Sequence, residues 1–209
     1  MAKQKRAAAT QAAIIRGAAS IFERWGYGDA SLSEIAKSAD VTKGALYFHY
    51  TSKEELALAV IDEQHRIATQ TGVTVRESGY PALETIIRIL RSFSDHLHND
   101  VVVRAGIRLT FEASAFHADV TRPYRDWSEE FESLLRQAIV EGDVSEHIDP
   151  QELGILIVGS YTGVQMVSNV LAQRQYLLTE ASVLCKYLLP SIVHDGRRAI
   201  IPHLQALWS

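Results

Sequence analysis

Two lysines, a histidine and three aromatic residues lie within thirteen positions, in the run VTKGALYFHYTSK at residues 41–53. Ammonium groups, hydroxyls and imidazoles bond to phosphates and base edges, so a short helix that presented them outward could contact DNA. The same aromatic residues could instead form the core and rim of a small helical bundle. The elements that flank the run decide which face each residue takes.

Residues 32–51 are predicted to form a helix, a tight turn and a second helix. Ser31 and Glu34 have the spacing of a capping box, which starts the first helix. Thr42 is the expected N-cap of the second helix. Between them, Asp40 takes the left-handed turn position that glycine usually fills, and aspartate is one of the few other residues that tolerates it. This layout is that of a helix-turn-helix, whose second helix enters the major groove of DNA.

The second helix is expected to turn Leu46 and Tyr50, four residues apart, toward the core shared with Ile35 and Ala36. Its outer face then carries lysine, glycine and aromatic side chains, and free amides at its start suit a phosphate oxygen. A basic segment at the N-terminus could follow the DNA backbone. The residues predicted to contact DNA are Lys3, Lys5, Arg6, Thr42, Lys43, Gly44, Tyr47, Phe48, His49 and Lys53.

The rest of the 209-residue chain has a helical period throughout and no alternating strand pattern, so the fold class is predicted to be all-α. Capping residues, proline and glycine mark the ends of the elements. The expected helices cover residues 8–24, 53–77, a stretch opened by Pro81, 101–114, 124–141, 150–173 with Asp149 as N-cap, 176–193 and 197–209.

Composition is that of a globular protein, with 47% hydrophobic residues and a net charge of −4. The charge is uneven, because residues 1–53 hold eight Lys or Arg against four acids, as suits a domain that meets a polyanion. The single cysteine, Cys185, excludes an internal disulfide and is expected in the core. With no secretory signal, the cytoplasm is the default location.

Catalytic and metal-binding patterns are missing from the sequence. It has no Gly-x-Ser-x-Gly elbow, phosphate-binding glycine loop or dinucleotide fingerprint. His96 and His98, two apart, would point to different faces of a helix. We therefore expect no catalytic residue, no metal and no cofactor, and the enzyme class is disfavoured.

Glu152 is followed by a stretch without charge, residues 153–173, which is long enough to span a bilayer. Polar side chains and three glycines interrupt this stretch. We therefore predict a helix buried on nearly all sides, inside a core or a subunit interface, and no membrane span.

The ordered run SEIAKSADVTKGALYFHYTSKEELA, after a helix that ends in GY, resembles the DNA-binding domain of the TetR family of transcriptional regulators. The resemblance implies an all-α homodimer with an N-terminal three-helix helix-turn-helix domain (1–53) and a helical ligand-binding and dimerisation domain (54–209). It implies a repressor whose partners are a double-stranded DNA operator and a small-molecule effector.

A narrower resemblance, carried by VTKGALYFHYTSKEELALAVI, GYPALE, VVRAGIRLT and PYRDW, is to the γ-butyrolactone receptor group of actinomycetes. It implies release from DNA by a γ-butyrolactone, butenolide or furan signal and control of antibiotic and other secondary-metabolite genes. Trp127 matches the tryptophan on which ligand response depends in that group. The alternative is a TetR-type regulator that senses an antibiotic or a metabolic intermediate.

A pocket for such an amphiphilic ligand needs hydrophobic walls and a few placed polar groups. The helices of the body offer apolar stripes with isolated polar residues, although a buried threonine or glutamine is often satisfied within the protein. The predicted ligand-binding residues are Gln64, Leu90, Phe93, Thr110, Trp127, Thr162 and Gln165.

The segments 153–173 and 176–193 are the predicted dimer interface, in which Gly159 and Gly163 would let helices approach closely. A two-fold dimer can read a pseudo-palindrome whose half-sites lie about 34–36 Å apart. If ligand binding tilted the helix that begins at Lys53, the recognition helices would lose this spacing.

Overall fold

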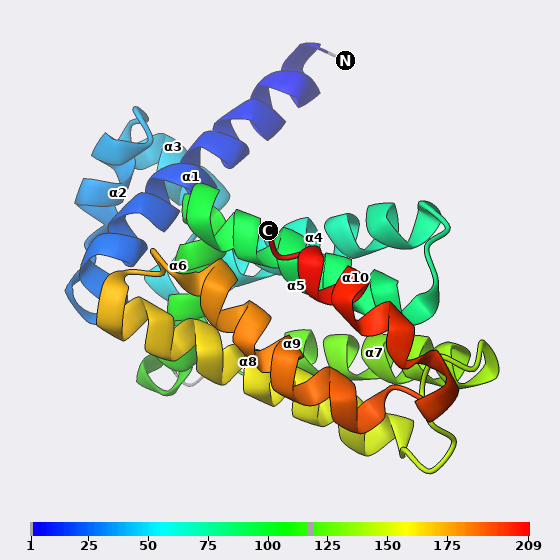
Figure 1. Cartoon of the computed structure of the whole chain (residues 1–209). Coiled ribbons are helices and arrows are strands. Elements are labelled where there is room, and N and C mark those ends of the chain that lie inside the picture. The colour runs from blue at the N-terminus through cyan, green and yellow to red at the C-terminus, as the bar shows by residue number, and fades with distance from the viewer. Residues whose placement is uncertain (1, 117–118) are drawn as a thin grey trace. The chain divides into compact units, whose positions relative to one another are not determined.

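The computed structural model describes residues 2–116 and 119–209, and of residues 2, 3 and 5 the backbone alone. Figure 1 follows the chain from the N-terminal helix in blue to the C-terminal helix in red. The elements are α1 (Ala2–Asp29), α2 (Leu32–Ser38), α3 (Lys43–His49), α4 (Lys53–Glu77), α5 (Ala82–Asn99), α6 (Val101–Phe111), η1 (Ala113–Phe116), α7 (Arg122–Val140), α8 (Pro150–Ala172), α9 (Leu177–Ile192), η2 (Asp195–Ile200) and α10 (Ile201–Ala206).

The all-α prediction is confirmed for the described residues, in which the only extended pairing is one isolated bridge between Val144 and Val193. The chain divides into two compact units. The first unit comprises Met1–Thr69 and Asn99–Val120, and the second comprises Gln70–His98 and Thr121–Ser209. The division falls inside α4, so this helix contributes residues to both units.

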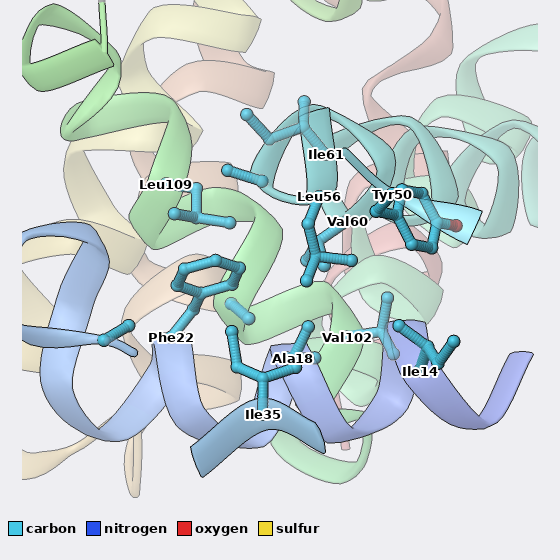
Figure 2. Packing of buried hydrophobic residues seen from close by; sticks show 14 of the residues in the cluster. Ile14, Ala18, Phe22, Ile35, Tyr50, Leu56, Val60, Ile61, Val102 and Leu109 are labelled. Atoms are coloured by element: carbon cyan, nitrogen blue, oxygen red, sulfur yellow. The ribbon is translucent and has the colours of Figure 1, made fainter. Parts of the chain in front are cut away.

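The core of the first unit joins α1–α3, the first turns of α4, and α6. Figure 2 shows Phe22, Ile35 and Leu109 directed toward this common centre from α1, α2 and α6. Close approach of α1 to the end of α2 requires a glycine, because a Cβ atom at Gly17 would lie 2.7 Å from the Cβ atom of Ala39. Because Leu109 and other side chains of α6 share this core, α6 belongs with the predicted DNA-binding helices.

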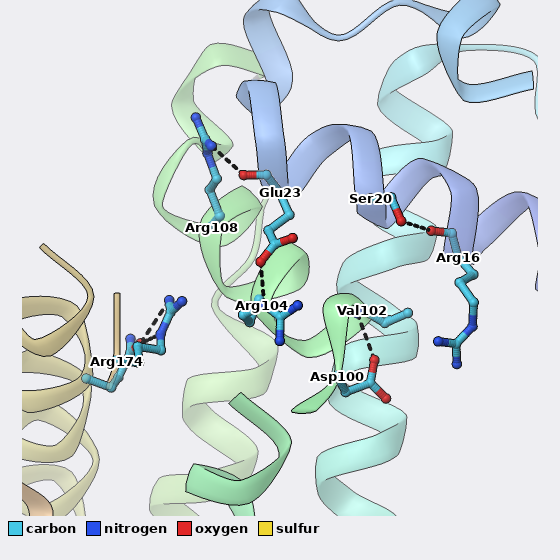
Figure 3. Close-up of polar contacts among 9 residues, drawn as sticks. Arg16, Ser20, Glu23, Asp100, Val102, Arg104, Arg108 and Arg174 are labelled. Carbon is cyan, nitrogen blue, oxygen red and sulfur yellow. Dashed lines mark hydrogen bonds and ion pairs between the residues drawn. The ribbon is translucent and has the colours of Figure 1, made fainter. Parts of the chain in front are cut away.

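α1 is longer than predicted and bends at Gly26, whose φ of 76° lies in the left-handed region. Arg108 of α6 and Glu112, the residue that caps the end of α6, both bond to the backbone around this bend, as Figure 3 shows for Arg108. The Nη1 atom of Arg108 donates to the carbonyl oxygen of Glu23 at 2.7 Å, and Glu112 accepts from the amide of Tyr27 at 2.6 Å. Glycine is required at position 26 for two reasons. The left-handed conformation disfavours other residues, and a Cβ atom would lie 2.6 Å from the Arg108 guanidinium.

The second unit packs α7 against α8 at a close crossing. A Cβ atom at Gly154 of α8 would lie 2.9 Å from the carbonyl oxygen of Ser128 and 3.1 Å from the amide nitrogen of Glu132. At the start of α8, Asp149 accepts from the amides of residues 151 and 152, as its predicted role as N-cap requires.

In the single chain α8 is not buried on nearly all sides, which does not fit the core alternative of the prediction and leaves the subunit interface. By length and composition α8 could cross a bilayer, and only 22% of its apolar window is buried. Gly159 and Gly163 have open space where a side chain would be. The exposed apolar residues are Ile155, Leu156, Met166, Val167, Val170 and Leu171 of α8, and Tyr176, Val183 and Tyr187 at and within α9. The sequence period did not distinguish a core from a subunit interface, because both faces of α8 are apolar.

Candidate functional site

The α2–turn–α3 segment has the geometry predicted from its capping residues. Ser31 accepts from the amide of Glu34 at 3.2 Å and donates to its carboxylate at 2.6 Å. Asp40 takes the left-handed conformation with φ 52°. Thr42 caps α3 by accepting from the amide of Ala45 at 3.1 Å. Each cap satisfies an amide that the helix itself leaves unpaired.

Packing fixes the rotation of α3 about its axis. Leu46 is fully buried, and Tyr50, which follows the helix, is 4% exposed. The Tyr50 hydroxyl accepts a hydrogen bond from Gln11 of α1 at 3.3 Å. With these two side chains in the core, the opposite face of α3 must point to solvent.

The outward face of α3 carries the side chains singled out in the sequence. Phe48 is 83% exposed and Tyr47 52% exposed, and Lys43 and Gly44 are exposed as well. His49 is half-buried, with its ring edge-on to Phe48 at a centroid distance of 5.3 Å. A core role is therefore excluded for Tyr47 and Phe48.

Lys53, at the start of α4, has a structural role that the sequence did not predict. Its ammonium group donates to the carbonyl oxygens of Gly28 and Ala30, at 3.0 Å each, and lies 4.6 Å from the ring centroid of Tyr27. The group thus fastens α4 to the turn between α1 and α2. Its contact with DNA stays a prediction.

The predicted basic arm is only partly described. The side chains of Lys3 and Lys5 lie outside the described residues, and Arg6 is exposed on the first turns of α1.

The predicted ligand-binding residues fall into both units. Gln64 and Thr110 belong to the first unit, where α4 and α6 touch. A Cβ atom at Gly106 would lie 2.4 Å from the Cβ atom of Gln64. Thr110 donates to the carbonyl oxygen of Gly106 at 2.8 Å, so its hydroxyl has a partner within α6.

The other predicted ligand-binding residues, Leu90, Phe93, Trp127, Thr162 and Gln165, belong to the second unit. The Phe93 ring lies 6.2 Å from that of Tyr161, and the Trp127 ring lies 5.6 Å from that of Phe131. Thr162 is half-buried, and Leu90 is 7% exposed.

Two buried polar pairs that the sequence did not predict involve or adjoin the predicted residues Phe93 and Gln165. The hydroxyls of Ser94 and Tyr161 lie 2.6 Å apart, and Arg174 donates to the side-chain oxygen of Gln165 at 3.4 Å. Burial raises the pKa of Tyr161, so its hydroxyl stays protonated. The sequence could not reveal the pairing of Ser94 with Tyr161, because the two residues are 67 positions apart.

The side chains considered for catalysis or metal binding have ordinary structural surroundings. Cys185 is buried, and burial raises the pKa of its thiol to about 11. It therefore stays protonated and is a poor nucleophile at neutral pH. His96 lies 2.8 Å from the hydroxyl of Thr71. Among the described residues, no three His, Cys, Asp or Glu side chains are grouped to hold a metal ion.

Comparisons with known proteins agree with this arrangement. Residues 14–60, which contain the helix-turn-helix, match the model for bacterial regulatory proteins of the tetR family. Residues 80–186 match the model for the tetracyclin repressor-like C-terminal domain. The A-factor receptor protein of Streptomyces griseus is 38% identical over 205 residues, which are 98% of this chain and 70% of that protein.

Two solved structures are similar over nearly the whole chain. A γ-butyrolactone receptor described as ArpA-like has a TM-score of 0.79 and 33% identity, covering 97% of this chain and 98% of that one. CprB of Streptomyces coelicolor, a TetR family protein in complex with its operator, has a TM-score of 0.80 and 33% identity, covering 97% of each chain. The chain belongs to the TetR family of bacterial regulatory proteins.

Proposed function

We propose that the protein is a dimeric repressor that binds a pseudo-palindromic operator and is released by a γ-butyrolactone-like signal. The observation that carries the proposal is the outward face of α3, with Phe48 83% exposed over a helix whose inner face is fully buried. The similarity to an A-factor receptor protein and to γ-butyrolactone receptors supports the class of signal. It favours a lactone over an antibiotic or metabolic intermediate.

Each residue of the α3 face has a chemically suitable role on DNA. Lys43 can donate to the O6 and N7 atoms of guanine, Phe48 can pack on a thymine methyl group, and Tyr47 and His49 can bond to phosphates. Gly44 has no internal reason to be glycine, because an added Cβ atom would meet only the Thr42 hydroxyl, at 3.9 Å. Close approach to the DNA backbone supplies such a reason.

The functional boundary is proposed to lie near residue 53, with residues 1–53 binding DNA and 54–209 binding the ligand and the second subunit. Grouping α6 with the first unit indicates that residues outside 1–53 support the DNA-binding helices. α4 joins both functions, since it begins at Lys53 and continues to Glu77.

The second subunit is proposed to cover the exposed apolar face of α8 and α9. Gly159 and Gly163 lie among apolar residues such as Val167 on α8, and glycine allows close helix approach. A water-exposed face of this kind marks a protein interface. Dimerisation would bring two copies of α3 to two half-sites.

Effector binding is proposed to involve Trp127 and the polar residues Gln64, Thr110, Thr162 and Gln165, with Leu90 and Phe93 as apolar walls. The effector must prefer the DNA-free conformation, and this preference sets how strongly it releases the operator.

Selection of binding sites from random double-stranded DNA tests the DNA-binding part of the proposal. The expected result is an enriched pseudo-palindrome whose half-sites are about one helical turn, or a multiple of it, apart. Enrichment of unrelated sequences, or of single half-sites only, would count against a dimeric operator-binding repressor.

A further inference from the structure

Trp127 rests directly on the backbone of α4, at a position that only glycine can occupy without displacement. A Cβ atom at Gly72 would lie 2.9 Å from the Cη2 atom of the Trp127 indole and 3.5 Å from its Cζ3 atom. Carbon atoms in favourable contact are about 3.5–4.0 Å apart, so the first distance is a clash. Both residues belong to the second unit.

Glycine at this position is otherwise unfavourable. Gly72 is buried in the interior of α4, five residues before the helix ends at Glu77. A glycine inside a helix is less stabilising than alanine, because it loses more backbone entropy on folding. The indole contact explains why the position holds glycine.

The contact is held from both sides. One turn further along α4, Arg76 donates to the carboxylate of Glu130 on α7 at 2.6 Å. On the other side of α7, Gly154 of α8 packs against the carbonyl oxygen of Ser128, the neighbour of Trp127. Because α7 is fixed against α8 at this point, its backbone cannot retreat easily from α4. A displaced indole must therefore press on α4 or rotate away from it.

α4 is also the helix whose beginning enters the core of the first unit. Leu56, Ala57 and Val60 are each fully buried in that core. A displacement of α4 at Gly72 is thus applied to the same continuous helix that supports the α2–turn–α3 segment.

We infer that Gly72 is a positioning residue that seats the Trp127 indole on α4, so that a movement of the indole upon effector binding is transmitted to α4. The inference rests on the proposed function for the response of Trp127 to the effector. It assigns to Gly72 the step between the sensor residue and the helix that joins the two units.

A double-mutant cycle on the full-length dimer tests the inference. Gly72→Ala adds the clashing methyl group, and Trp127→Phe removes the indole edge that it meets. We expect Gly72→Ala alone to weaken operator binding without effector by about tenfold and to lower the melting temperature. In the Trp127→Phe background the same substitution is expected to change operator affinity by less than about threefold and to leave the melting temperature equal or higher.

Gly28→Ala is the matched control, because a Cβ atom at this helical glycine would meet nothing within 4 Å. We expect it to leave the operator affinity unchanged and the melting temperature equal or higher. Equal penalties for Gly72→Ala in both Trp127 backgrounds, or no penalty in either, would overturn the inference. If Gly72→Ala failed to fold, recovery of folding by Trp127→Phe would support the contact, and no recovery would overturn it.

The outcome is distinguishable from failure of the proposed function. Coupling between the two substitutions in the melting temperature would show the contact between Gly72 and the Trp127 indole even if the wild-type protein bound no operator. Absence of operator binding would overturn the proposed function alone. Coupling in the melting temperature with an operator affinity and an effector response unchanged by Gly72→Ala would overturn transmission through α4.

Discussion

The Nζ atom of Lys53 lies 3.0 Å from the carbonyl oxygen of Ala30 and donates a second hydrogen bond to the carbonyl oxygen of Gly28. Replacing Lys53 with methionine keeps most of the aliphatic stem but removes the donors. Bonds from a charged group contribute more than neutral ones, and partial exposure reduces the effect, so we expect a loss of about 1–2 kcal/mol in the free energy of unfolding. Urea denaturation measures it. Unchanged stability would mean that these bonds contribute nothing.

Substitution of Lys43 separates DNA binding from folding. Lys43 is exposed at the start of α3. Lys43→Ala is expected to cost about 1–3 kcal/mol of operator binding if the ammonium group reads a base edge, with an unchanged melting temperature. Arg136→Ala, which removes an exposed charge on α7, is the control. Equal operator affinities for the two variants in an anisotropy titration would remove Lys43 from the interface.

A charge on the exposed face of α8 tests the dimer interface. Val170 is 76% exposed in the single chain. Val170→Glu would have to bury a carboxylate without a partner in the dimer, which is strongly unfavourable. We expect a monomer by sedimentation equilibrium, with helical circular dichroism retained and operator binding weakened. A dimer of unchanged affinity would place the interface elsewhere.

Glu84 makes stability depend on pH at the start of α5. Burial raises the pKa of its carboxyl group, but hydrogen bonds from His203 and Arg88 outweigh burial, so the pKa lies below its ordinary value of 4.5. The carboxylate therefore stabilises the fold above about pH 4.5, and this stabilisation is lost as the pH falls through the lowered pKa.

Glu84→Gln is expected to be less stable than the wild-type protein by about 1–2 kcal/mol at pH 7, with the difference shrinking below pH 4.5. Thermal melts between pH 3 and pH 7 give both curves. Parallel curves would show that the carboxylate does not carry the pH dependence.

Local signals in the sequence predicted the helix-turn-helix well. Capping by Ser31 and Thr42, the left-handed Asp40 and the burial of Leu46 all involve residues within a few positions of one another. Such short-range patterns are dictated by backbone hydrogen-bonding needs that hardly depend on the rest of the fold.

Long-range contacts were not predictable in the same way. Three contacts join residues far apart in the sequence: the hydrogen bond from Lys53 to Gly28, the hydrogen bond from Arg108 to Glu23, and the packing of Trp127 on Gly72. The sequence left two settings open for α8, a core or a subunit interface, because an apolar helix looks the same whether its second face meets its own chain or another subunit.

We propose that a diffusible lactone releases this protein from its operator. The most direct measurement is fluorescence anisotropy of the purified protein on labelled DNA from upstream of its own gene, at fixed salt, with and without γ-butyrolactones and butenolides. We predict tight binding that an active lactone abolishes, and Trp127→Ala protein that binds DNA but no longer responds. Tight binding that none of these lactones relieves, or equal release of the Trp127→Ala protein, would contradict the account.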